Sequence, residues 1–519
     1  MAGIDSLNDG RVKSSCKRLD HIFGIMGSIA KENMYLPIVV VDEILEYLDL
    51  ETIKSLRLTD RTWSELCLGP RFKSFMRHQS TDLTPQSLES LSALSCHAIL
   101  RPAVKDLTIV AAVYDSSLLQ RVLRTSRCEN ENSTLWIAAR DCTLDEVVQA
   151  EADLAWLEEQ SSKHQLKQEN HIVSTLAAIL NNFGRLDWVS MEAKVTHSPR
   201  PEVFRSRGDW HAIWLKATQV YHIAMSAIAK STISLNSLTI FRNPIRSAIP
   251  SNEITTHMRT LDAGACTFAS GQSIKNFSID LSTRIDTDRE RLSKRRGDIV
   301  IWELETRRSW HGLSPGTLLA SLEPEVNSED NYPGVARLLQ KMPNLEALTL
   351  RLRCTVIGDV SLYHRLFEEI ASKVHLPQLK RLRLLGIYAT SDSLQCFLRK
   401  HPDIEILGLE KVNLVFGTWQ PVFEEIRKMP ALTRVVLASI SGEGRTLNLR
   451  PAEDKDDRSD PSNTDYYLCT RGVFVHRREF DARDIQKGFQ FNTDNQGAPQ
   501  GTHGFTSFLV FDQEHYGLP

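Results

Sequence analysis

The sequence predicts an α/β protein in which a small bundle of helices precedes a long, irregular solenoid. A short motif of the form leucine-x-x-leucine-x-leucine recurs along the chain, which is typical of repeated strands. A helical stretch and a proline come before each of the four clearest copies. The chain has 519 residues, of which 41% are hydrophobic and 24% charged, so it can bury a sizeable core.

The four clear copies lie in the second half of the chain and start at Leu345, Leu379, Ile404 and Leu432, which are 34, 25 and 28 residues apart (379−345, 404−379, 432−404). Each follows a proline by two residues, and the helical stretches before the prolines are 334–341, 366–374, 393–400 and 422–428. Fainter copies are found at 104–109, 186–191, 235–240, 274–279 and 299–304.

One repeat alone cannot bury its apolar face, so repeats of this length must stack on one another. Alternate side chains of a strand point to the same face, which places the second and third leucines of each motif in the core. We therefore expect residues 100–450 to form a solenoid with a parallel sheet on its concave side and helices on its convex side. Insertions are expected at 126–133, 193–210 and 282–298.

Before the repeats, residues 1–34 are polar and predict a flexible arm, whereas residues 35–80 predict a bundle of three short helices. Apolar residues recur at helical spacing in the first helix, at Val40, Ile44, Tyr47 and Leu48. The second helix carries Ile53 and Leu56, and the third carries Trp63, Leu66 and Cys67 and is expected to end at Gly69-Pro70. Such a small bundle usually needs a partner or a neighbouring domain.

The order of residues in this bundle resembles an F-box, and the repeats resemble leucine-rich repeats. The F-box pattern consists of Leu36-Pro37, Ile44-Leu45, Leu48, Leu56-Arg57-Leu58 and Arg61-Thr62-Trp63. Val39 departs from it, because the family usually has an acidic residue there. The asparagine that follows the third leucine of a leucine-rich repeat is also mostly missing, which implies an irregular arc.

The F-box resemblance implies binding to the adaptor subunit of an SCF-type cullin-RING ubiquitin ligase. The residues implied to contact the adaptor are Leu36, Pro37, Ile44, Leu45, Leu48, Leu56 and Trp63. The protein would then be the substrate receptor of the ligase, with the adaptor and cullin as partners and an unknown protein as substrate. An alternative is a leucine-rich-repeat scaffold that binds a partner without any ubiquitin-ligase role.

The chain shows no glycine-rich phosphate loop, no nucleophile elbow and no metal-ligand spacing of histidines and cysteines, so we expect neither an enzyme nor a bound metal or cofactor. A hydrolase whose site is assembled in space is a third alternative. The net charge of −3 argues against a nucleic-acid binder, and no apolar run is long enough to span a membrane. The nine cysteines are widely spaced, which indicates reduced thiols in the cytoplasm or nucleus.

Four arginines are expected on the concave face, because they lie at motif positions that point away from the core. These are Arg351, Arg381, Arg383 and Arg434, and we expect them to form a patch that binds an acidic or phosphorylated segment of the substrate. A solvated basic face is the alternative. After the last repeat, residues 451–465 predict a charged linker, and residues 466–519 predict a terminal cap with strands at 466–475 and 505–511.

Overall fold

The computed structural model describes two compact units, one ending at Arg77 and one beginning at His78. The described residues are 38–59, 61–129, 139–166, 168–199, 210–242, 247–264, 268–284, 328–353, 361–442, 445–449, 466–469, 472–489 and 491. Several predicted features therefore lie outside the described residues. These are Leu36, Pro37, the repeat at 299–304, the linker at 451–465 and the expected strand at 505–511.

Within its described residues, the first unit holds four helices: α2 (Ile38–Glu46), α3 (Leu50–Arg57), α4 (Arg61–Leu66) and α5 (Pro70–Met76). The third helix ends before Gly69-Pro70, as predicted, but the described bundle has one helix more than the three expected. Pro70 occupies the first turn of α5, where its missing N–H is not needed for an intrahelical hydrogen bond. Residues 78–80, which were assigned to the bundle, belong to the first strand of the second unit.

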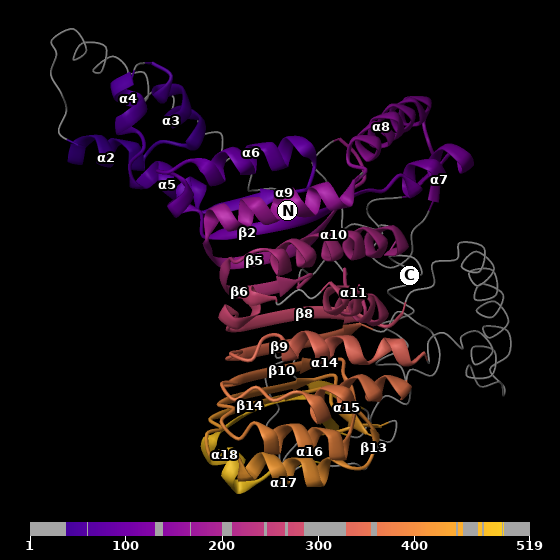
Figure 1. Ribbon diagram of the computed structural model, residues 1–519. Helices are drawn as coiled ribbons and strands as arrows, with labels where there is room; N and C mark the ends of the chain where they lie inside the picture. Colours follow the sequence, from indigo (N-terminus) through magenta and orange to yellow (C-terminus); the bar gives the residue numbers. More distant parts are fainter. Residues whose placement is uncertain are drawn as a thin grey trace. The chain divides into compact units, whose positions relative to one another are not determined.

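The second unit is built on one large, almost entirely parallel sheet (Figure 1). Its spatial order is β1-β2-β5-β6-β8-β9-β10-β12-β14-β19, and the short β7 pairs with β8. The strands are β1 (His78–Thr81), β2 (Asp106–Tyr114), β5 (Arg185–Thr196), β6 (Ser234–Ile240), β7 (Ile249–Pro250), β8 (Asn276–Ser282), β9 (Ala347–Arg353), β10 (Arg381–Leu385), β12 (Ile406–Glu410), β14 (Arg434–Ala438) and β19 (Arg477–Asp481).

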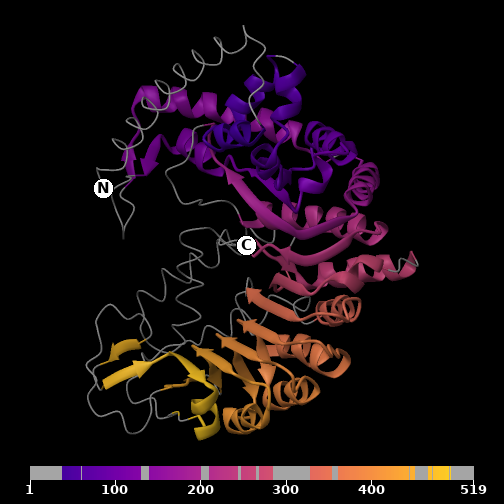
Figure 2. The same ribbon diagram turned by 90° about the vertical axis from the view of Figure 1, so that its left-hand side faces the viewer.

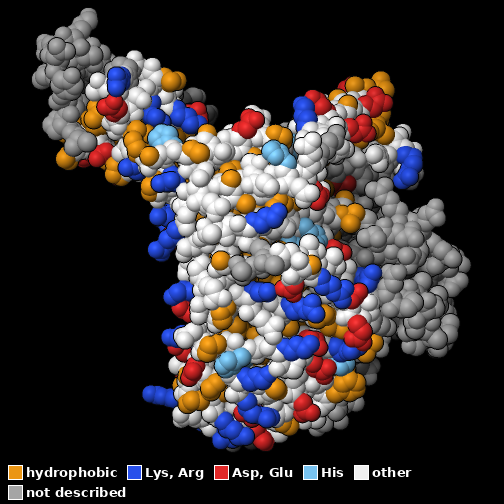
Figure 3. All heavy atoms as spheres, viewed as in Figure 1, with side chains coloured by type: hydrophobic (Ala, Val, Ile, Leu, Met, Phe, Trp, Pro, Cys, Tyr) orange, Lys and Arg blue, Asp and Glu red, His pale blue; other side chains and the backbone are white. Residues whose placement is uncertain are grey.

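Helices cover one face of this sheet, and the other face is left open by them (Figures 1 and 2). The covering helices are α6 (Pro85–Cys96), α9 (Glu169–Phe183), α10 (Trp210–Lys230), α11 (Ser251–Ala263), α14 (Pro333–Gln340), α15 (His364–Lys373), α16 (Ser391–Lys400) and α17 (Trp419–Lys428). Figure 2 shows that the sheet curves with its open face on the inside. Basic and acidic side chains are interspersed on the helix-covered side (Figure 3).

The eight repeats that fall on described residues all form strands, as predicted. They correspond to β2, β5, β6, β8, β9, β10, β12 and β14, which are consecutive neighbours in the sheet. The four predicted helices before the prolines are α14 to α17, so the coarse prediction of a parallel α/β architecture is confirmed. Consecutive parallel strands follow from the sequence because each short helix returns the chain to the same end of the sheet.

Smaller elements lie at the rim of the second unit. The helices α7 (Ser117–Thr125) and α8 (Leu144–Lys163) flank a hairpin of β3 (Arg127–Glu129) and β4 (Ala139–Asp141). The insertion expected at 193–210 begins later than predicted, since residues 193–196 continue β5. Cys142 is disulfide-bonded, so the expectation of reduced thiols throughout the chain is wrong at this position.

The last described segment closes the sheet at its far end. A second sheet along the rim has the order β11-β13-β15-β16, from β11 (Tyr388–Thr390), β13 (Asn413–Phe416), β15 (Ser441–Gly442) and β16 (Arg445–Thr446). The strands expected at 466–475 are the hairpin β17 (Tyr466–Cys469) and β18 (Gly472–Val475). After them, β19 pairs antiparallel with β14, and the helix α18 (Ala482–Lys487) follows.

Candidate functional site: the open face of the sheet

The register of the parallel strands places chemically similar side chains side by side on the open face. Strand neighbours in a sheet are about 4.8 Å apart, so residues in register form continuous rows. One row runs through Ser80, Thr108, Ser190, Thr239, Ser278 and Thr349, on six adjacent strands, and continues with Arg383 and Gly408. The first six members are all hydroxyl residues, so we call this row the hydroxyl row.

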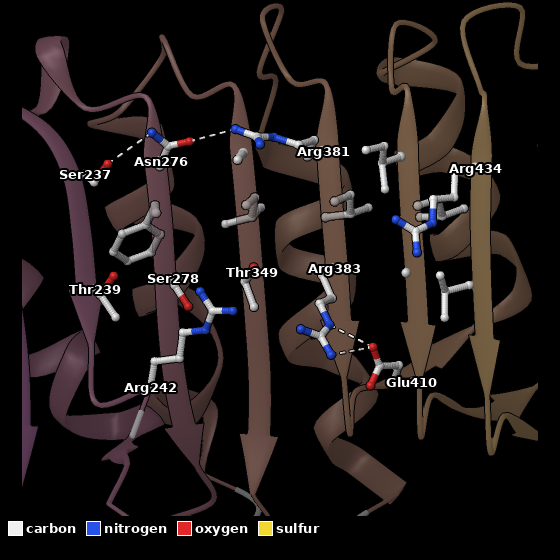
Figure 4. A pocket seen from close by; sticks show the side chains of 18 of the residues that line it. Ser237, Thr239, Arg242, Asn276, Ser278, Thr349, Arg381, Arg383, Glu410 and Arg434 are labelled. Carbon is white, nitrogen blue, oxygen red and sulfur yellow. Dashed lines mark hydrogen bonds and ion pairs between the residues drawn. The ribbon is translucent and has the colours of Figure 1, made fainter. Parts of the chain in front are cut away.

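A second row lies beside it and begins with His78 and Asp106 on β1 and β2. It contains Trp188, Ser237, Asn276, Ala347, Arg381, Ile406 and Arg434. The Asn276 amide donates to Ser237 Oγ at 3.1 Å, and Arg381 Nη2 donates to Asn276 Oδ1 at 3.1 Å across the small Ala347 (Figure 4). Trp188 Nε1 donates to Thr239 Oγ1 at 3.0 Å and so connects the two rows.

Parts of both rows line an open groove of about 740 Å³ on the open face, which we call the open-face groove (Figure 4). Small residues create this hollow, because Ala347 and Gly408 lie in the rows between larger side chains. A Cβ atom on Gly408 would lie 3.2 Å from Arg383 Cγ, so the glycine leaves room for that arginine. The groove also contains two acidic residues, Asp187 and Glu410.

Three of the four predicted arginines contribute to the groove. Arg381, Arg383 and Arg434 line it, whereas Arg351 does not. Arg383 contacts Glu410 Oε1 through Nε and Nη2, both at 2.7 Å. Arg434 pairs with Glu479, with Nε 2.6 Å from Oε1 and Nη2 2.8 Å from Oε2, and this pairing lowers the pKa of Glu479.

Arg351 instead belongs to a buried ion cluster beside the groove. Arg351 Nη1 and Arg353 Nη2 lie 3.1 and 2.9 Å from Asp280 Oδ2. Asp280 is fully buried, and burial raises the pKa of its carboxyl although Arg353 and Arg351 act in the opposite direction. Three of the four arginines are thus paired with carboxylates of the same chain, and only Arg381 has a neutral hydrogen-bond partner.

Sequence reasoning missed Arg242, which follows β6 and lines the groove. Arg242 is exposed and makes no hydrogen bond or ion pair with the part of the chain that the structure describes. Its side chain points toward Ser278 of the hydroxyl row (Figure 4). No repeat motif marks this position, but its place directly after a predicted strand was readable from the sequence.

A separate cluster of titratable groups lies at the carboxyl ends of β1 and β2. His164 Nε2 is 3.0 Å from Asp82 Oδ2 and 3.1 Å from the Tyr114 hydroxyl. Lys216 Nζ donates to the His164 carbonyl, and burial lowers the pKa of Lys216 to about 8. The open-face groove contains none of these residues.

The residues that the F-box resemblance implies as adaptor contacts differ in how deeply they are buried in the first unit. Leu45, Leu48 and Leu56 are buried, and Ile44 and Trp63 are half-buried. The large apolar side chains that the unit exposes are Val39, Tyr47 and Leu58, at 71%, 84% and 87%, together with Val40.

Comparison with protein-family models and with curated proteins finds no match for the chain. Among the described residues, no three metal-ligating side chains converge on one point, and no helix has the length and apolar character to cross a membrane.

Proposed function

We propose that the protein is the substrate receptor of an SCF-type ubiquitin ligase, with an F-box-like first unit and a leucine-rich-repeat-like second unit. The first unit binds the adaptor, which joins it to the cullin. The second unit holds a protein substrate near the ubiquitin-carrying enzyme, so that catalysis is provided by proximity and by other subunits. The protein acts in the cytoplasm, the nucleus or both.

The observation that carries the proposal is the exposed apolar surface of the first unit. The described part of this unit consists of a few short helices, yet it exposes four large apolar side chains, those of Val39, Val40, Tyr47 and Leu58. Exposed apolar side chains that cluster on a small unit are typical of protein–protein contact sites. Leu45, Leu48 and Leu56 are buried in the unit's own core, so the exposed apolar side chains are the ones available to a partner.

The experiment is a pull-down of the adaptor with the purified full-length chain. Tyr47→Glu combined with Leu58→Glu is expected to reduce adaptor binding by about tenfold or more, because charges would be buried in an apolar contact. Leu144→Glu is the matched control, since Leu144 is equally exposed, at 80%, but lies on α8 of the second unit. Wild-type protein that retains no adaptor would contradict the proposal.

A scaffold without a ligase role is the competing function, and the same experiment separates the two. Such a scaffold needs the open-face groove but no adaptor. Recovery of protein partners from cells without the adaptor and cullin would favour it.

A further inference from the structure

The hydroxyl row contains a buried hydroxyl group without a partner, which is unusual in a folded protein. Ser278 Oγ makes no hydrogen bond with the described residues, although the side chain is only 6% exposed. Its neighbours in the row, Thr239 and Thr349, lie on β6 and β9 to either side. An unpaired buried hydroxyl carries a free-energy cost, which a bound ligand would remove.

Arg242 supplies the charge that such a ligand would need. It is the groove arginine with neither a carboxylate partner nor a hydrogen bond in the described residues, and it points toward Ser278 (Figure 4). Arg383 and Arg434 are neutralised by Glu410 and Glu479. Of the four predicted arginines, Arg381 alone has a neutral partner, and the charge nearest to Ser278 is that of Arg242.

We propose that Arg242 and Ser278 bind the carboxylate of an aspartate or glutamate side chain in an extended, acidic segment of a partner protein. A single guanidinium pairs with a planar carboxylate through two parallel hydrogen bonds, and the Ser278 hydroxyl donates a third. Arg381 lies across β9 from Ser278's strand and adds a second positive charge, since its partner is the neutral Asn276.

The charges on the open face favour a carboxylate over a phosphate group. A phosphate carries close to two negative charges and is usually held by several basic residues. Here Asp187 lines the same groove and would repel a dianion more strongly than a carboxylate. Glu410 occupies Arg383, so that arginine is not available as a further basic partner for a phosphate. The residues that line the groove include members of seven strands, from β5 to β14 in the order of the sheet, so it extends across the sheet, which fits an extended peptide. The inference deepens the proposed function by naming the chemistry of the substrate.

The test measures peptide binding to the full-length chain by fluorescence anisotropy, without adaptor or cullin. The probe is a labelled peptide in which glutamate and glycine alternate, and its controls contain glutamine or phosphoserine in place of glutamate. Wild-type protein is expected to bind the glutamate peptide most tightly, and increasing salt is expected to weaken this binding. Equal binding of the glutamine peptide would overturn the anion site, and tighter binding of the phosphoserine peptide would overturn the choice of carboxylate.

Variants then locate the site. Arg242→Gln is expected to weaken binding of the glutamate peptide by about tenfold, the effect of losing one charged hydrogen-bonding partner. Ser278→Ala is expected to weaken it severalfold without lowering the thermal unfolding midpoint, because the hydroxyl has no partner among the described residues. Arg337→Gln on α14 is the matched control, since Arg337 is also exposed and has no ion pair with the described residues but lies on the helix-covered side.

Unchanged affinity of the Arg242→Gln variant would refute the site. Failure of the peptide site can be distinguished from failure of the proposed function, because the adaptor is proposed to bind the first unit and the peptide to bind the second. Arg242→Gln should therefore retain full adaptor binding. Peptide binding with no adaptor binding would reject the ligase role and leave the acidic-peptide site in place.

Discussion

The arginines of the open face differ in burial, and this decides what each ion pair contributes to stability. Asp280 is fully buried between Arg351 and Arg353, whereas Arg434 and Glu479 are both about half exposed. Removing one partner of a buried pair leaves an uncompensated charge, while an exposed pair is screened by water. The same residue type on the same face of the sheet thus has a structural role in β9 and a largely solvated one in β14.

Asp280→Asn is expected to lower the free energy of unfolding by about 2 kcal/mol, a value reduced from that of fully buried pairs because both arginines retain some exposure. Glu479→Gln, which breaks the exposed pair, is expected to leave stability unchanged within error. Urea denaturation of both variants at neutral pH measures the two effects. A larger loss in Glu479→Gln than in Asp280→Asn would contradict this account of burial.

His401 makes stability depend on pH. Leu376 N–H donates to His401 Nε2 at 3.0 Å, and Nδ1 donates to the Phe397 carbonyl at 2.7 Å, so the ring is held neutral. Burial lowers the pKa of His401 from 6.5 to about 4. At pH values between the folded and the unfolded pKa of His401, the unfolded chain therefore binds more protons than the folded chain. The stability from His401 is complete above the unfolded pKa and is lost as the pH falls toward the folded pKa.

His401→Gln is expected to be less stable than wild type at pH 7, and the difference should shrink by roughly 2 kcal/mol between pH 7 and pH 5. Denaturant titrations at both pH values measure this change. His257, whose pKa burial lowers to about 3, remains in the variant, so some pH dependence persists. A constant difference between the two proteins over this range would show that His401 is not the titrating group.

At the scale of elements, the conformation of each repeat is set by the residues that end its helix and its strand. Helices α14 to α17 end two to four residues before a proline, and proline disfavours the helical conformation at the residue before it. After β10 the chain leaves the sheet at Gly386, whose φ of +67° favours glycine. A side chain there would also collide with the Leu352 carbonyl of the neighbouring strand β9.

Gly386→Ala is expected to cost at least about 2 kcal/mol of stability, from the left-handed backbone and the collision together. Gly184→Ala is the matched control, because Gly184 has a similar φ of +72° but open space around it. It should cost only about 1 kcal/mol. Thermal unfolding of both variants gives the comparison, and equal losses would mean that the close approach to Leu352 does not matter.

At the scale of the whole molecule, the two units have cores of very different size. The core of the first unit consists of Val41, Leu45, Leu48, Ile53, Leu56, Cys67 and Phe72. The core of the second unit is one continuous cluster from Leu83 to Ile485. Because stability grows with the apolar surface that a unit buries, the small unit should open more readily than the large one.

Hydrogen exchange followed by mass spectrometry tests this difference. Amides of α2 to α5 are expected to exchange at least about tenfold faster than those of β9, β10 and β12, since local opening of the small unit costs less free energy. Saturating adaptor should slow exchange in α2 to α5 alone. Equal protection of the two units would contradict the inference from core size.

The sequence by itself determined eight strands of the large sheet and the helices α14 to α17, because the repeated motif and the helical stretches before its prolines dictate which side chains must be buried. It also placed Arg381, Arg383 and Arg434 on one face, since alternation along a strand is a local property. Only the tertiary structure decided which of them carry free charge. Glu410, Glu479 and Asp280 neutralise their arginines through contacts between neighbouring strands, and Arg242 and Ser278 meet in the groove only when β6 and β8 pair. The paired charges lie on different strands that are far apart in the sequence, so their pairing depends on the register between strands. The pattern of residues within one repeat does not contain this information.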